Sequence, residues 1–192
     1  ISNHRNHGHY IANGGPLKPF FAELLGREGA LCNGEGGSQH IHFNNFFSFG
    51  ILGGNVPIAC GIALAEKLNG HPNNIVTIFI GDGAFGEGIV YEALNIASLW
   101  ELNVFFVVEN NKIAQTTDIK TNTAGTLEDR IKAFGIKTNV LKSTDVEEIN
   151  FLSNTIISEI RSEGKCQALI LENHRLGPHS KGDDSRTVEE IN

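Results

Sequence analysis

The sequence predicts an α/β fold in which a parallel sheet is flanked by helices. Two apolar, β-branched runs without charge, residues 75–80 and 104–108, have the pattern of strands buried on both faces. Between them, residues 87–101 place apolar side chains at helical spacing. Strand, glycine turn, helix and strand together form a unit whose two turns open at the carboxyl edge of one sheet, where α/β sheets bind ligands.

The remaining elements follow from the same periodicities. Residues 17–27, a segment from Pro57 to Leu68, residues 127–134 and residues 145–163 predict helices, and Asp145 fits the cap of the last one. Residues 138–141 and 168–171 predict strands, whereas residues 29–49 and 112–126 predict loops. The residues expected to face the core are Leu17, Phe20, Phe21, Leu24, Leu25, Ile58, Ile62, Ala65, Leu68, Ile89, Ala93, Ile96, Ala97, Trp100, Val146, Ile149, Leu152, Ile156, Ile157 and Ile160.

Composition narrows the class of protein. A chain of 192 residues, 40% hydrophobic and 19% charged, suits one domain, residues 1–192. A net charge of −7 gives no general attraction to nucleic acid or an anionic membrane, so a phosphate site must be built locally. No apolar run reaches the roughly 18 residues of a spanning helix, and no signal peptide is visible. Cys32, Cys60 and Cys166 lack CxxC spacing, which favours reduced, buried thiols in a cytoplasmic protein.

The glycine turn after the first strand has two interpretations. Gly81-x-Gly83-x-x-Gly86 fits the dinucleotide fingerprint, and Glu109 follows near the distance expected of a ribose-binding acid. Asp82, however, would set a carboxylate beside a pyrophosphate, and like charges repel unless a cation lies between them. Mg²⁺ resolves this conflict, because it joins protein oxygens to phosphates; Asp82 and Asn111 offer such oxygens from neighbouring strand ends.

Several motifs occur together in a fixed order. Gly81-Asp82-Gly83 is followed, after residues 84–109, by Asn110-Asn111. Around this pair stand His4-Arg5-Asn6-His7-Gly8, Gly34-Glu35-Gly36-Gly37-Ser38-Gln39-His40, Gly50-Ile51-Leu52-Gly53, Glu109-Asn110-Asn111 and Arg175-x-x-x-His179-Ser180. The first pair resembles the thiamine diphosphate motif. The whole set is similar to the α subunits of 2-oxo acid dehydrogenases, the family of the pyruvate, branched-chain and acetoin enzymes.

The resemblance implies a site for thiamine diphosphate and Mg²⁺. It implies that Asp82, Asn111 and the carbonyl of Ile113 ligate the metal, and that the Gly50 carbonyl and Leu52 amide bind the aminopyrimidine. Phosphate contacts are implied for His4 and Arg5, of which Arg5 suits a phosphate better because guanidinium binds it in bidentate fashion. The remaining cofactor residues are Gly81, Gly83, Ala84, Arg175 and His179, with the Gly83 and Ala84 amides at a helix start.

The resemblance also implies a division of labour. His179 is the expected catalytic residue, on a mobile loop over the active site. The glutamate that activates the aminopyrimidine would come from a β subunit, since the chain shows no second α/β unit. We therefore expect two α and two β chains, oxidative decarboxylation of a 2-oxo acid (or acetoin cleavage), and acyl transfer to a lipoyl group on a partner acyltransferase. Because relatives carry further helical segments, we expect this sequence to be part of a longer subunit.

Two other functions stay open at this point: a nicotinamide-dependent dehydrogenase and a non-catalytic relative of the α subunit. Glu35, Gln39 and Gln115 depart from the residues common in the family, which leaves the second open. The pairs His7-x-His9 and His40-x-His42 could suggest zinc, but no cysteine or carboxylate at ligand spacing completes four ligands. We expect these histidines to line the entrance of the active site. Which 2-oxo acid is used lies beyond the sequence.

Overall fold

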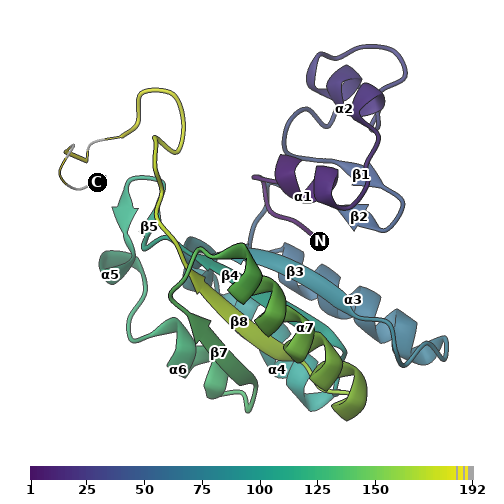
Figure 1. Ribbon diagram of the computed structural model, residues 1–192, viewed down its shortest axis with the longest axis vertical. Coiled ribbons are helices and arrows are strands. Elements are labelled where there is room, and N and C mark those ends of the chain that lie inside the picture. Colours follow the sequence, from purple (N-terminus) through teal and green to yellow (C-terminus); the bar gives the residue numbers. More distant parts are fainter. Residues whose placement is uncertain (185, 188, 190–192) are drawn as a thin grey trace.

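A computed structural model describes residues 1–184, 186, 187 and 189, and its centre is one parallel sheet with the strand order β3-β4-β8-β7 (Figure 1). The strands are β3 (Val76–Gly81), β4 (Val104–Asn110), β7 (Lys137–Leu141) and β8 (Gln167–Glu172). In their register Gly81 lies beside Glu109, and Asn110 lies beside Glu172. The strands therefore end together at one carboxyl edge, as the fold prediction requires.

Helices cover both faces of this sheet, as the charge-free strand sequences predict. α3 (Asn55–Leu68) and α4 (Gly88–Leu99) pack on one face, and α7 (Val146–Glu163) packs on the other (Figure 1). The first layer encloses Ile78, Ile80, Phe106, Val108 and small residues of α3 and α4. The second encloses Phe105, Val107, Leu169, Ile156 and Ile160. Burying a side chain of this size stabilises the fold by about 1.5–3 kcal/mol.

Capping residues fix the ends of α7. Asp145 lies just before the helix, and its Oδ1 accepts hydrogen bonds from the N–H groups of Glu147 at 2.7 Å and Glu148 at 3.3 Å. Gly164 ends the helix with φ +66°, a left-handed conformation that costs glycine little. The predicted cap is confirmed. Thr126 caps the shorter α6 (Leu127–Lys132) in the same way, through the N–H of Asp129.

The N-terminal residues form a small separate layer. It contains α1 (His7–Ala12), α2 (Leu17–Leu24), β1 (His42–Phe43) and β2 (Phe46–Phe47), which pack around Tyr10, Phe20, Ile41 and Phe46. Figure 1 places this layer beyond the β3 side of the sheet. Ile1 joins it to β3, because its N–H group bonds to the Thr77 carbonyl and its carbonyl accepts from the Phe79 N–H.

Glu23 organises the segment that we predict to be a long irregular loop. Its carboxylate is buried and accepts four backbone N–H bonds at 2.6–3.1 Å, from Cys32, Gly34, Gly36 and Gly37. Burial alone would raise the pKa of Glu23, but these four bonds lower it overall. Residues 29–49 are therefore held by a defined network and include two short strands, which differs from the loop expected.

Several helix faces differ from the prediction. In α4 the buried residues are Val90, Ala93, Leu94 and Ala97, whereas Ile89 and Trp100 are 41% and 46% exposed. Glu92, Asn95 and Ser98 of α4 recur at a spacing of three and mark its polar side, and the predicted stripe is rotated from the one that meets the sheet. In α3, Val56, Ala59, Cys60 and Ala63 face the core, whereas Ile58, Ala65 and Leu68 are exposed, because small residues allow closer packing. Leu17, Phe21 and Leu25 around α2, and Val146 in α7, are likewise exposed.

The polar segment after β4 also has more structure than expected. It forms the hairpin β5 (Ile113–Ala114) and β6 (Thr117–Asp118), followed by α5 (Ile119–Asn122). The turn after β3 is a 3-10 helix, η1 (Asp82–Gly86). Of the helices described, none has both the length and the apolar character needed to cross a membrane.

Candidate cofactor-binding site

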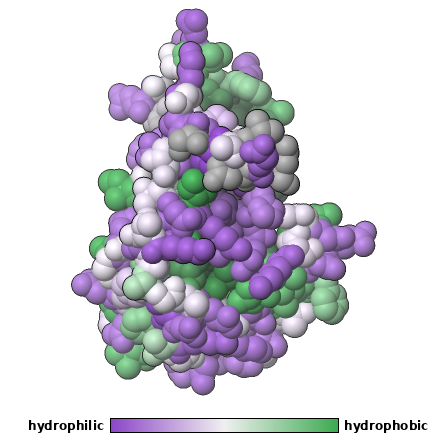
Figure 2. All heavy atoms as spheres, turned by 90° about the vertical axis from the view of Figure 1, so that its left-hand side faces the viewer, coloured by the Kyte–Doolittle hydropathy of each residue, from purple (hydrophilic) through white to green (hydrophobic). Residues whose placement is uncertain are grey.

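A cavity of about 890 Å³ lies at the carboxyl edge of the sheet. All twelve residues predicted for the site line its wall: His4, Arg5, Gly50, Leu52, Gly81, Asp82, Gly83, Ala84, Asn111, Ile113, Arg175 and His179. They come from the N-terminal segment, the loop before α3, the end of β3 with the turn η1, the turn after β4 with the β5–β6 hairpin, and the segment after β8. The roles of these residues stay predictions, but residues far apart in the sequence meet here. Figure 2 faces the side that carries the segment after β8, and its middle is largely hydrophilic.

Asp82 is the buried charge of this site. Only 3% of it is exposed; its Oδ1 accepts from the Gly83 N–H at 2.8 Å, and its Oδ2 is buried without a partner. Burial raises the pKa of Asp82, although the Gly83 N–H and the Arg175 guanidinium oppose the rise. A buried carboxylate oxygen without a partner is costly unless a ligand completes it.

The turn after β4 brings the side-chain oxygen of Asn111 to the cavity, and Asn110, at the strand end, braces the turn. Asn110 Oδ1 accepts from the Lys112 N–H at 3.2 Å, and Asn111 Oδ1 accepts from the Ile113 N–H at 3.1 Å. Lys112 adopts φ +65°, which is uncommon for a residue with a Cβ and marks a tight turn. An amide oxygen has two lone pairs, so Asn111 retains capacity for a cation. Asp82 and Asn111 thus offer oxygens of the kind that Mg²⁺ binds, and Ile113 lines the same wall; their role as metal ligands stays a prediction.

Close packing holds this turn against η1. A Cβ built at Gly83 would lie 2.6 Å from the Cβ of Ala114, closer than real contacts allow. Glycine at this position therefore lets the β5–β6 hairpin approach the start of η1. The Gly50–Gly53 loop is equally tight, because Glu87 Oε1 accepts from the Gly53 N–H at 3.1 Å and a Cβ at Gly53 would lie 2.3 Å from Glu87 Oε2.

The cationic side of the cavity joins the two ends of the chain. Arg5 Nη2 donates to the His179 carbonyl at 2.9 Å, and the Nε2 atoms of His4 and His179 are 3.4 Å apart. Burial, with the nearby Arg5 charge, lowers the pKa of both histidines. Arg175 Nη1 donates to the Gln115 carbonyl at 2.6 Å, which links the final segment to the β5–β6 hairpin.

Unpartnered polar atoms gather in this cavity. His4 Nδ1, Asp82 Oδ2 and Arg175 Nε are buried without a hydrogen-bond partner among the described residues, and all three residues line the wall. One anionic residue and two residues that can carry positive charge therefore border one volume. This combination fits a phosphate ligand bound through a metal, and the residues present fit the group that the sequence implies.

Some wall residues were not assigned by the sequence analysis. They are Asn3, Gln39, Glu87, Glu109, Ala114, Gln115, Asn173, His174, Leu176, Gly177 and Pro178. Most are neighbours of assigned residues, so proximity along the chain was the available signal. Glu109, the acid considered for a ribose, is engaged with the N-terminal segment, because its Oε2 accepts from Asn3 Nδ2.

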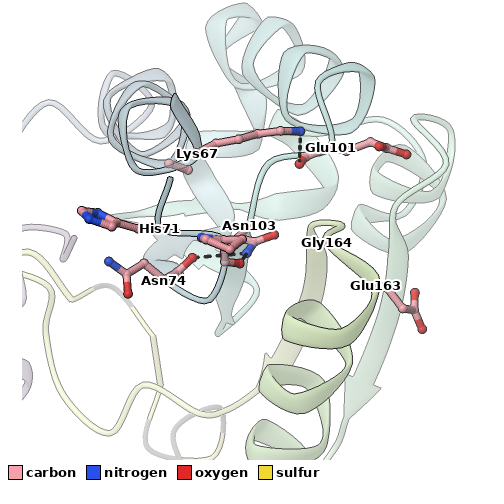
Figure 3. A pocket seen from close by; sticks show the side chains of 9 residues that line it. Lys67, His71, Asn74, Glu101, Asn103, Glu163 and Gly164 are labelled. Carbon is pink, nitrogen blue, oxygen red and sulfur yellow. Dashed lines mark hydrogen bonds between the residues drawn. The ribbon is translucent and has the colours of Figure 1, made fainter. Parts of the chain in front are cut away.

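A second cavity, of about 210 Å³, lies between the ends of α3, α4 and α7 (Figure 3). Its polar groups bind one another: Lys67 Nζ donates to the carbonyls of Trp100 at 2.7 Å and Glu101 at 3.1 Å, and Asn103 Nδ2 donates to the Asn74 carbonyl at 3.3 Å. It contains none of the predicted site residues. We assign it a structural role, the capping of the end of α4.

Comparison with known proteins gives a consistent result. Residues 1–192 match the family described as dehydrogenase E1 component. The chain is 38% identical over 197 residues to a pyruvate dehydrogenase E1 component subunit alpha of Rickettsia typhi, covering 100% of the chain and 60% of that relative. It is 38% identical over 186 residues to the alpha subunit of an acetoin:2,6-dichlorophenolindophenol oxidoreductase of Cupriavidus necator, covering 95% of the chain and 56% of that relative. The chain thus spans about three-fifths of these relatives.

Solved structures share the fold. A transketolase from Campylobacter jejuni has a TM-score of 0.57 and 26% identity, covering 65% of this chain and 20% of that one. A transketolase mutant from Pichia stipitis has a TM-score of 0.58 and 23% identity, with the same coverage of 65% and 20%. The predicted parallel sheet flanked by helices is confirmed.

Proposed function

Because the chain belongs to the dehydrogenase E1 component family, we propose that it is the cofactor-anchoring domain of the alpha subunit of a thiamine diphosphate-dependent 2-oxo acid or acetoin dehydrogenase. The observation that carries the proposal is the buried, unpartnered Oδ2 of Asp82 on the cavity wall. A divalent cation would complete this oxygen and would also screen the carboxylate from an anionic ligand.

We assign the metal to Asp82, Asn111 and the carbonyl of Ile113, with Mg²⁺ as the cation. Hard oxygen donors favour this metal, and diphosphate oxygens would complete its shell. Arg5, His4 and Arg175 bind the diphosphate. Arg5 suits this role because guanidinium presents two parallel donors to phosphate oxygens.

The loop at Gly50 and Leu52 orients the ring end of the cofactor through backbone groups. Its position is supported by the Glu87 bond to the Gly53 N–H. When bound, thiamine diphosphate supplies the nucleophilic carbon and the electron sink for decarboxylation. The chain itself orients the cofactor and excludes water.

His179 is proposed as the catalytic residue of this chain. Its lowered pKa makes the imidazole neutral near pH 7, so it can accept a proton, or donate one through an N–H group, without placing a further charge beside Arg5. Its Nδ1 lies 2.9 Å from Ser180 Oγ, which helps to orient the ring.

A beta subunit completes the site in this proposal. The two glutamates among the described residues of the cavity wall, Glu87 and Glu109, each accept a hydrogen bond within the chain, from Gly53 and Asn3, which gives both a structural role. We propose that the beta subunit supplies the glutamate that activates the aminopyrimidine, that the assembly contains two alpha and two beta chains, and that a lipoyl group on an acyltransferase accepts the acyl group.

The experiment is a cofactor titration of the full-length alpha subunit, alone and with its beta subunit. Thiamine diphosphate should bind in the presence of Mg²⁺ and be released by a chelator, and turnover of a 2-oxo acid should require both chains. Binding of NAD with no binding of thiamine diphosphate would refute the function. Turnover by the alpha subunit alone would refute the division of labour.

A further inference from the structure

We propose that Asn3 and Glu109 are positioning residues that hold the His4–Arg5 turn against the carboxyl edge of the sheet, so that Arg5 meets the diphosphate. This inference rests on the proposed function of the cavity. The structure brings a buried amide and a strand-end carboxylate together directly behind that turn.

Asn3 joins the sheet to the backbone of Arg5. The residue is 5% exposed; its Oδ1 accepts from the Arg5 N–H at 2.8 Å, and its Nδ2 donates to Glu109 Oε2. A backbone N–H only donates and a carboxylate only accepts, so these two partners fix the orientation of the amide. Asn3 thus transmits the position of Glu109 to the turn that carries Arg5.

Glu109 is itself attached to a rigid element. It lies near the end of β4, in register with Gly81, so it stands next to the strand end that carries Asp82. Its Oε1 lies 3.9 Å from His9 Nε2, and the His9 ring stacks on Phe79 with the centroids 3.9 Å apart. The segment between Asn3 and His9 therefore approaches the same carboxylate at both of its ends.

Glu109 also needs an explanation on electrostatic grounds. A carboxylate on the wall of a cavity for an anionic diphosphate repels the ligand, as Asp82 would without a cation. The contacts with Asn3 and His9 give Glu109 a different purpose, the ordering of the residues that supply positive charge. Arg5 itself is exposed, and its guanidinium donates to the exposed His179 carbonyl, so this contact does little to fix it.

Exchanging the amide and the carboxylate of the Asn3–Glu109 hydrogen bond tests the proposal. Asn3→Asp keeps the acceptor for the Arg5 N–H but faces Glu109 with a second carboxylate. Glu109→Gln keeps an acceptor for Asn3. In the double variant the new amide can donate to the new carboxylate, which restores the bond with its direction reversed. All three variants preserve side-chain volume, so folding should be retained. Glu87→Gln serves as the matched charge control, because Glu87 lines the same cavity and the glutamine keeps an oxygen that accepts from the Gly53 N–H.

The measurements are the Kd of thiamine diphosphate at saturating Mg²⁺ and kcat at saturating cofactor, with the full-length alpha subunit and its beta subunit. We expect Asn3→Asp to raise Kd about tenfold, as losses of such supporting contacts do, with kcat unchanged. Glu109→Gln should stay near wild type, and the double variant should recover most of the affinity. Asn3→Asp combined with Glu87→Gln should not recover it.

Two results would overturn the inference: wild-type affinity in Asn3→Asp, or equal recovery with Glu87→Gln and Glu109→Gln, which would show that net charge alone matters. If wild type does not bind thiamine diphosphate with Mg²⁺, the proposed function fails, and this inference fails with it. If wild type binds thiamine diphosphate with Mg²⁺ and Asn3→Asp has the same Kd, the inference is refuted and the proposed function stands.

Discussion

Replacing Glu23 by glutamine should destabilise the whole N-terminal layer. The Glu23 carboxylate accepts four backbone N–H bonds from residues 32–37 and is 1% exposed. A glutamine side chain has one acceptor oxygen in place of two. Its NH₂ group would face the two backbone N–H groups that one Glu23 oxygen accepts in the wild type, and a donor cannot satisfy them. About two N–H groups lose their partner, each at about 1–3 kcal/mol.

Part of this loss is recovered because the segment is half-exposed and water can reach it. We therefore expect Glu23→Gln to lower the free energy of unfolding by about 2–3 kcal/mol, near the lower end of the range of about 2–6 kcal/mol for two N–H groups. For a chain of this size, this corresponds to a fall of about 4–12 °C in Tm. Urea denaturation and calorimetry at pH 7 measure it, and limited proteolysis should show earlier cleavage within residues 29–40.

The stability that the Glu23 carboxylate contributes depends on pH. The pKa of Glu23 is lowered in the folded chain, so the unfolded chain binds its proton more readily. The contribution to stability is therefore present above the ordinary carboxyl pKa and is lost as pH falls through the lowered folded value. The difference between wild type and Glu23→Gln should shrink only in acid. Glu35→Gln, an exposed change in the same segment, is the control. A Glu23→Gln variant within about 0.5 kcal/mol of wild type at pH 7 would refute this reasoning.

Three further predictions concern the cavity. Gly83→Ala would place a Cβ 2.6 Å from the Cβ of Ala114 and displace the hairpin that carries Ile113. We therefore expect titration to show metal-dependent cofactor binding that is at least about tenfold weaker. Unchanged affinity would contradict the packing argument. His179→Ala should lower turnover by about 10²-fold or more with cofactor affinity retained, in steady-state kinetics and titration, and unchanged turnover would exclude the proton-transfer role. Asp82→Asn should raise the Tm of the cofactor-free chain at pH 7, because the raised folded pKa means that the ionised carboxylate costs stability there. This cost shrinks as pH falls through the raised pKa and is gone below the ordinary carboxyl pKa; a lower Tm at pH 7 would argue against it.

The strands and the site were predictable because their signals are local. Uncharged apolar runs identify β3 and β4, and the parallel unit then places Asp82 and Asn111 at one edge. Residues at the two ends of the chain, such as Arg5 and His179, came to the site only through the resemblance to a family, since no local pattern joins them.

The helix faces and the network behind the site were not predictable in the same way. Glu92, Asn95 and Ser98 mark one side of α4, but apolar residues fill much of the rest, so the stripe that meets the sheet depends on the neighbouring α3. Glu23 looks like an ordinary polar residue on an amphipathic helix, because its four partners are backbone groups nine or more positions away. Asn3 and Glu109 are 106 positions apart in the sequence, and an amide–carboxylate pair has no spacing rule.

The central claim is that Asp82 holds a divalent cation that binds a diphosphate. The most direct measurement is calorimetric titration of thiamine diphosphate into the full-length alpha subunit with its beta subunit, at fixed Mg²⁺, for wild type and Asp82→Ala. We predict that the substitution weakens the magnesium-dependent binding by about 100-fold, since it removes the anionic ligand of the metal. Equal, magnesium-dependent affinity in the two proteins would contradict the account.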